Sequence, residues 1–179
     1  VDAGLKSRQY RIEVGDGVKI LAHDERTLMQ AFYHLEDLMN LRKAPFLKKG
    51  VETRRSVFEV RMAHSGYGND MFPEAHLKQL AHAGMTAIIV FLDDIDKTKM
   101  QEYQDLKALI RLARKNGLDT YLYSYITAFA HPDDGQAAFD DTYGRIAGYY
   151  PEAKGIILVG ESCQFPSKDP RVQPRTWKQ

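Results

Sequence analysis

Two kinds of periodicity divide the first forty residues. Apolar residues alternate with polar ones over residues 10–14 and again over 18–22, and the turn Gly15-Asp16-Gly17 separates the two runs. Alternation broken by a glycine-rich turn predicts a β-hairpin. Residues 24–40 change to a helical spacing, with Asp24 as the expected N-cap. One face carries the apolar residues Leu28, Phe32, Leu35 and Met39. A hairpin and one helix cannot bury a core alone, so we expect this part to pack on another element.

Residues 42–55, RKAPFLKKGVETRR, interrupt both periodicities. Their proline, glycine and clustered basic residues predict a linker or domain boundary.

From residue 56 onward, strands alternate with helices. The expected strands are VFEVRMA (57–63), TAIIVFL (86–92), TYLYSYI (120–126) and GIILV (155–159). We expect helices to begin near Pro73, near Thr98 and near Gly135, the first ending at Gly84 and the second at Asn116-Gly117. The second would bury a stripe made of Met100, Tyr103, Leu106, Ile110 and Ala113. This order is typical of an α/β fold with a parallel sheet.

The two faces of these strands distinguish an open sheet from a barrel. In 57–63, Phe58, Val60 and Met62 would share one face, while Glu59 and Arg61 share the other. Tyr121, Tyr123 and Tyr125 would likewise lie together. Because a central strand of an open sheet is apolar on both faces, this pattern favours a (β/α)8 TIM-barrel type fold with an inner face that carries polar groups.

Four strand-helix units are visible, whereas a closed barrel has eight. The chain is therefore either a four-stranded open sheet or about half of a barrel, and we favour the half barrel. Residues 1–50 would then be the C-terminal part of an accessory α+β domain, and 51–179 the N-terminal half of the barrel.

Composition excludes several functional classes. The 179 residues are 44% hydrophobic and 27% charged with a formal net charge of +1, so no bulk charge favours nucleic acid. No apolar run is long enough to span a membrane. Cys163 is the only cysteine, which excludes an internal disulfide and a cysteine-based zinc cluster. The first residue is Val, so we expect the natural start to lie upstream.

Polar residues follow the carboxyl end of each expected strand, where barrel enzymes place their active sites. In chain order these residues are Arg61, His64, Tyr67, Asp93, Asp94, Tyr125, His131, Glu161 and Ser162.

Glycoside hydrolysis needs two carboxyl groups, one of them protonated. Glu161, beside an apolar strand that would raise its pKa, is the best candidate for the acid. It can equally be a solvated loop residue or the partner of an arginine. Asp93 and Asp94 are adjacent, so their side chains diverge, and at least one is expected to cap the next helix.

The remaining candidates also have two interpretations. Arg61 can bind a sugar hydroxyl or carboxylate, or form a structural ion pair, which we slightly favour. His64 and His131 can donate to sugar hydroxyls, or they can simply be surface residues. Tyr123 and Tyr125 can stack on a sugar ring, or they can be packing groups. The spacing of His64, Asp93, His131 and Glu161 gives little support to a metal site, and no phosphate-binding loop is present, so no cofactor is expected.

The order of these parts resembles family 20 glycoside hydrolases, the β-N-acetylhexosaminidases, and related barrel glycosidases such as α-glucuronidases. YRIEV-GDG-VKILA and TLMQAFYHLEDLMNL are similar to the hairpin and helix that precede the barrel in that family. Arg54-Arg55-Ser56, HLKQLAHAGMTAIIVFLDD and LVGES are similar to segments around the first, second and fourth barrel strands.

The resemblance implies a glycosidase that acts on a carbohydrate and has an extracellular or periplasmic location. It also implies that Glu161 protonates the leaving oxygen. The family's Asp-Glu pair is reduced to one carboxylate here. Half a barrel would be inactive alone and could self-associate through its unpaired strand edges. The alternatives are a non-catalytic carbohydrate-binding barrel and a self-contained four-stranded α/β domain with an unrelated ligand.

Overall fold

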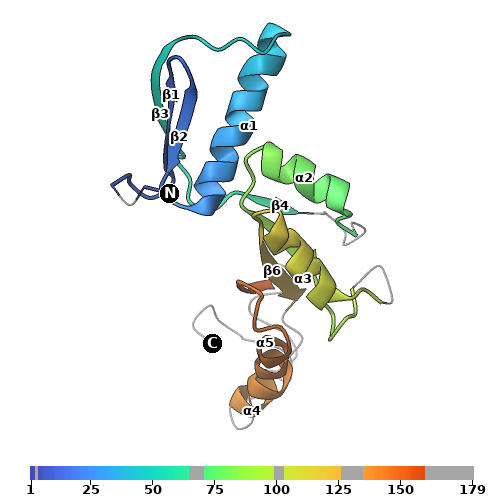
Figure 1. Cartoon of the computed structure of the whole chain (residues 1–179). Coiled ribbons are helices and arrows are strands. Elements are labelled where there is room, and N and C mark those ends of the chain that lie inside the picture. Colours follow the sequence, from blue (N-terminus) through green and yellow to red (C-terminus); the bar gives the residue numbers. More distant parts are fainter. Residues whose placement is uncertain (3, 65–70, 99–102, 126–134, 160–179) are drawn as a thin grey trace. The chain divides into compact units, whose positions relative to one another are not determined.

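The protein is described by a computed structural model that covers residues 1–2, 4–64, 71–98, 103–125 and 135–159 (Figure 1). The described residues form two compact units. The first contains Val1–Arg61 and Lys78–Thr86, and the second contains Met62–Leu77 and the chain from Ala87 onward.

The first unit is built on a three-stranded antiparallel sheet in the order β2-β1-β3. β1 (Gln9–Val14) and β2 (Val18–Ala22) form the predicted hairpin, with Ile12 opposite Ile20. Ile12 and Ala22 are buried on the face against which α1 packs. The alternation in the sequence thus correctly predicted the hairpin and its buried side.

β3 (Gly50–Arg55) corrects the expected linker over residues 42–55. It pairs along its whole length with β1, so that Thr53 lies opposite Arg11. Its charged side chains obscured the strand in the sequence, because at an edge of the sheet they can remain in water. The first compact unit therefore extends beyond residue 50, and the division into an accessory domain and half a barrel stays a prediction.

α1 (Glu25–Arg42) begins at the predicted cap, where the Asp24 carboxylate accepts a hydrogen bond of 2.7 Å from the Thr27 amide. Its buried face is rotated by about one residue from the expected stripe. Thr27 and Ala31 are buried, whereas Phe32 is 54% exposed. Small side chains on this face let the helix approach the sheet closely, which the apolar periodicity alone did not reveal.

The second unit is an α/β structure with a four-stranded parallel sheet in the order β4-β5-β6-β7. Its strands are β4 (Met62–His64), β5 (Ala87–Phe91), β6 (Asp119–Tyr125) and β7 (Gly155–Val159). The last three confirm the predicted strands.

β4 is much shorter than the expected strand over 57–63. The segment before it lies outside both sheets, with Phe58 69% exposed, so Phe58, Val60 and Met62 do not form one buried strand face. Glu59 and Arg61 accordingly do not lie on a barrel strand. The physical reason is that β3 ends at Arg55 and β4 begins at Met62. The residues between them form the connection from one sheet to the other and cannot also extend β4.

The helices between the strands follow the prediction with one correction. α2 (Glu74–His82) follows Pro73, and α4 (Gly135–Phe139), a π-helical turn (Asp140–Gly144) and α5 (Arg145–Tyr149) form the helical segment near residue 135. α3 (Leu106–Lys115) begins eight residues later than expected, with Asp105 as its cap, so Tyr103 is exposed instead of buried.

The two faces of the parallel sheet differ in burial. Residues in register share a face, so Val90, Leu122 and Ile156 lie together on one side. This side is buried at β5 and β6, where α3 packs against β6 (Figure 1). The opposite side carries Tyr121 and Tyr123, which are half-buried as an amphipathic inner face would require.

Candidate active site at the carboxyl ends of the parallel strands

The carboxyl ends of β4 and β5 bring three of the predicted site residues to one edge of the sheet. His64 ends β4, and Asp93 and Asp94 follow β5. Tyr125 ends β6, where its backbone is described. Tyr67, His131, Glu161 and Ser162 lie outside the described residues. In the sequence, Glu161 comes two residues after Val159, the last residue of β7.

Three rings meet across this edge. His64 lies 5.0 Å from Phe91 and 5.1 Å from Tyr123, measured between ring centroids, and Phe91 and Tyr123 are 4.7 Å apart. They come from three neighbouring strands and share the half-open face of the sheet. Such tilted and edge-to-face contacts hold the rings in fixed orientations. His64 and Tyr123, which the sequence analysis had named, can each present part of a ring to a ligand, whereas Phe91 is buried.

Asp94 is held by a cation from another element. Its Oδ1 accepts a hydrogen bond of 2.8 Å from Arg145, the first residue of α5, and another of 2.7 Å from the Ile95 amide. The hydrogen bond from Arg145 is the main cause that lowers the pKa of Asp94 below its usual value of 3.8, while burial acts weakly in the opposite direction. Asp94 is therefore a carboxylate at neutral pH and cannot serve there as a proton donor.

We expect Asp94→Asn to make the stability of the protein less dependent on pH. Since the folded state lowers the pKa of Asp94, its stabilising contribution is present above pH 3.8 and is lost as the pH falls through the folded-state pKa. The free energies of unfolding of the wild type and the variant should differ at about pH 7 and converge below pH 3.8. Asp93→Asn is the matched control, and an equal pH response in both variants would contradict the assignment to the Arg145 pair.

The loop after β5 is anchored by Asp96 and Tyr150. The Tyr150 hydroxyl donates to Asp96 Oδ1 over 2.8 Å and accepts from the Asp96 amide over 2.6 Å. Asp96 Oδ1 also accepts from the Leu106 amide at the start of α3, over 3.2 Å. Burial, and then the hydrogen bond to Asp96, raise the pKa of Tyr150, so the hydroxyl stays protonated. The sequence analysis overlooked this pair, because the only signal was a third acid in the run DDID.

Tyr150→Phe is expected to destabilise the protein by about 1–3 kcal/mol, because it leaves the Asp96 amide and carboxylate without the hydroxyl between them. Tyr150 is only 2% exposed, so water cannot readily replace the lost group. Chemical denaturation measures the effect. Tyr149→Phe is the control, since that residue is 37% exposed and its ring contact with Lys107 does not need the hydroxyl. Equal losses in the two variants would argue against a special role for the Asp96 anchor.

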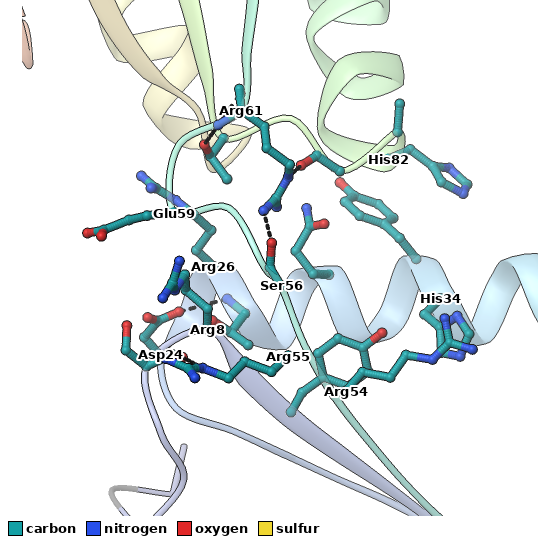
Figure 2. A pocket seen from close by; sticks show the side chains of 18 of the residues that line it. Arg8, Asp24, Arg26, His34, Arg54, Arg55, Ser56, Glu59, Arg61 and His82 are labelled. Atoms are coloured by element: carbon teal, nitrogen blue, oxygen red, sulfur yellow. Dashed lines mark hydrogen bonds between the residues drawn. The ribbon is translucent and has the colours of Figure 1, made fainter.

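Arg61 lies before β4 and belongs to the first compact unit. Its guanidinium donates to the Gly84 carbonyl, the Ser56 hydroxyl and the Phe58 carbonyl, the last at 2.8 Å (Figure 2). Its backbone amide donates to the Thr86 hydroxyl over 2.9 Å. These contacts fasten the connection that precedes β4. They are made with neutral oxygens and not with an acidic side chain, so the structural ion pair that the sequence analysis slightly favoured and a role in substrate binding both stay predictions.

Neither a metal cluster nor a membrane-spanning helix occurs in the described ranges. Within them, no three His, Cys, Asp or Glu side chains gather in a way that could hold a metal ion. Likewise, none of the helices described is long and apolar enough to cross a bilayer.

The parallel sheet, its helices and the polar edge together define a glycosidase-like α/β fold. Three solved structures that are similar to the chain are glycoside hydrolases. The structure of CpGH84B matches 93% of this chain with a TM-score of 0.68 and 15% sequence identity. A mutant beta-hexosaminidase from Streptomyces plicatus, in complex with its product GlcNAc, matches 72% of the chain with a TM-score of 0.56 and 14% identity.

A further match is the crystal structure of a beta-N-acetylhexosaminidase, which covers 78% of the chain with a TM-score of 0.51 and 16% identity. The chain spans about a third of the length of these structures, with 32%, 33% and 37% covered. No family model and no curated protein sequence matches it. The expected resemblance to hexosaminidases is thus confirmed at the level of the fold.

Proposed function

We propose that this chain is part of a glycoside hydrolase that cleaves a glycosidic bond in a carbohydrate. The single observation that carries the proposal is the edge of the parallel sheet. There His64, Asp93 and Asp94 gather on a fold shared with hexosaminidases, and Glu161 follows β7 in the sequence. In this proposal residues 1–50 are the end of an accessory α+β domain, and 51–179 form the first half of a (β/α)8 barrel.

Each residue at this edge has a proposed role. Glu161 is the general acid that protonates the leaving oxygen. Asp94, held as a carboxylate by Arg145, accepts hydrogen bonds from sugar hydroxyls, and Asp93 is a second such group. His64 donates to a hydroxyl from its place against Phe91 and Tyr123, and the half-buried ring of Tyr123 offers a surface for stacking on a pyranose. The second catalytic group would come from the substrate or from the other half of the barrel.

The half barrel also has a consequence for the isolated chain. Among the residues that the structure describes, β4 and β7 each have one neighbour in the sheet, so each presents an edge without a partner there. We therefore propose that the 179 residues alone are inactive and self-associate through these edges.

The proposal is tested by assaying the protein that contains this chain on a panel of aryl glycosides and on natural oligosaccharides. Hydrolysis that disappears when Glu161 is changed supports the proposal. Binding of oligosaccharides without hydrolysis, measured by calorimetry, would instead support a non-catalytic carbohydrate-binding barrel. A chain that neither binds nor cleaves any carbohydrate in the panel would contradict both.

A further inference from the structure

One end of the first compact unit brings together the turn of the hairpin, the end of α1 and the start of β3 (Figure 1). Gly50, the first residue of β3, lies opposite Val14, the last residue of β1 before the turn. Arg42, the last residue of α1, lines the same pocket as these two residues. We call residues 15–19 and 41–51 together the hairpin-end surface.

The hairpin-end surface has a strong excess of positive charge. It holds five cations and one acid, Asp16, whereas the whole chain has a formal net charge of only +1. Asp16 Oδ1 lies 3.3 Å from Lys49 Nζ. The bordering acids Glu13 and Glu52 are each paired with an arginine, at 3.0 Å and 2.5 Å. The five cations, all of them exposed, are Lys19, Arg42, Lys43, Lys48 and Lys49.

Apolar side chains lie exposed among these cations. Leu41 is 81% exposed and Phe46 is 72% exposed, and Val51 is exposed as well. Beside them, a pocket of about 350 Å³ between α1 and the sheet is lined by six aliphatic side chains together with Arg42, Lys48, Lys49 and Glu52. Single exposed apolar residues are ordinary, but several of them beside an apolar pocket form a patch of the kind that marks an interaction surface.

The loop that carries Phe46 is held by the end of α1. Lys43 has a φ of 53°, and its amide donates to the Asn40 carbonyl over 3.0 Å. Arg42 donates to the Phe46 carbonyl over 3.0 Å. Glycine is the usual residue in the left-handed conformation that ends a helix, because it has no Cβ. The chain therefore places a lysine where the helix end favours glycine, and it fixes the backbone of Phe46 while the ring stays in water.

We propose that the hairpin-end surface binds the surface of an anionic lipid bilayer. Leu41 and Phe46 enter the headgroup region, and the cations around them contact lipid phosphates. Basic and apolar side chains side by side are the combination that holds a protein segment at a membrane interface. Each cation near an anionic leaflet strengthens such binding about fivefold.

Charge and apolar area together favour a bilayer over other occupants. A second copy of the chain would bring two surfaces of the same sign together, and these repel each other. A soluble polyanion would pair with the cations but would leave the aliphatic side chain of Leu41 in water. The hairpin-end surface contains none of the proposed active-site residues, so this proposal does not depend on the glycosidase proposal.

The test is flotation of the 179-residue protein with lipid vesicles in a density gradient. Self-associated protein without lipid stays at the bottom of the gradient, so it does not imitate binding. Vesicles made of equal parts of phosphatidylglycerol and phosphatidylcholine should carry the protein upward, whereas vesicles of phosphatidylcholine alone should not. Raising the salt concentration from about 0.1 M to about 0.5 M should weaken the binding, because it screens the exposed cations.

Variants then locate the surface. Lys43→Gln combined with Lys48→Gln is expected to weaken binding to the anionic vesicles about tenfold or more, since two cations are lost. Phe46→Ala is expected to weaken it about threefold or more, because less apolar area enters the headgroup region.

Matched controls remove the same groups elsewhere. Lys6→Gln combined with Arg111→Gln removes two exposed cations outside the hairpin-end surface. Phe58→Ala removes a ring that is 69% exposed, close to the value for Phe46, in the same compact unit. Both controls should leave the binding within about twofold of the wild type. Far-UV circular dichroism verifies the fold of each variant, and the wild-type comparison of the two vesicle types is decisive if a variant does not fold.

Several results would overturn the proposal. The wild type would fail to bind the anionic vesicles, or it would bind the neutral vesicles equally well. The control variants would lose as much binding as the variants of the hairpin-end surface. Finally, heparin would bind as tightly as the anionic vesicles while Phe46→Ala had no effect, which would identify a site for soluble polyanions instead of a membrane surface.

Discussion

Replacement of Glu161 by glutamine is expected to lower kcat/KM of the intact enzyme by about 10²–10⁴-fold, the contribution usual for a general acid. Glutamine has the same shape but cannot supply a proton to the leaving oxygen. The position of Glu161 is the reason for the expectation. β7 runs parallel to β6 and ends at Val159, and Glu161 follows two residues later in the sequence, as the active-site residues of barrel enzymes follow their strands.

The leaving group distinguishes an acid from a residue that only binds. A nitrophenyl leaving group needs little protonation, so Glu161→Gln should affect nitrophenyl glycosides less than alkyl glycosides or oligosaccharides. The decline of activity at high pH, which reports deprotonation of the acid, should also disappear in the variant. Glu152→Gln is the control, since Glu152 lies before β7 and pairs with Arg114. Equal losses on all substrates, or an unchanged rate, would rule out the acid role.

Replacement of Leu122 by alanine is expected to destabilise the protein by about 2–5 kcal/mol, the range measured for buried leucines. Leu122 is 0% exposed in the middle of β6, with Val90 and Ile156 beside it on the face against which α3 packs. Removing its side chain would leave a cavity that the two neighbouring strands cannot fill without changing their register.

Leu158→Ala provides a matched comparison on the next strand. Leu158 lies on the same face of the sheet as Leu122, but it is 46% exposed, so we expect a loss of about 1 kcal/mol or less. Urea denaturation of both variants gives the two free energies of unfolding. Similar losses would mean that the helix-covered face is not the main core of the second unit.

The sequence alone predicted those helices and strands whose local pattern agrees with the contacts that they make in the folded protein. Alternation around Gly15-Asp16-Gly17 specified the hairpin, and apolar runs bounded by turns specified β5, β6 and β7. Gly84 and Gly117, both with positive φ, lie just beyond the ends of α2 and α3 as predicted. Such signals depend on a few neighbouring residues, so they can be read without knowing what the element will contact.

Other features depended on contacts between residues far apart in the sequence. Gly50–Arg55 resembles a basic linker and becomes a strand only because β1 offers an unpaired edge. Because a connection follows β3, the first strand of the parallel sheet begins at Met62 and not at Val57 as expected.

The sequence by itself therefore determined an α/β chain with a hairpin and helix in front, and it identified the polar residues that follow each strand. Only the tertiary structure decided which of them meet. It placed His64 against Phe91 and Tyr123, and it joined Asp94 to Arg145, 51 residues further along the chain. The physical reason is that periodicity reports which side of an element avoids water, whereas a partner for a ring or a charge is chosen by packing between elements.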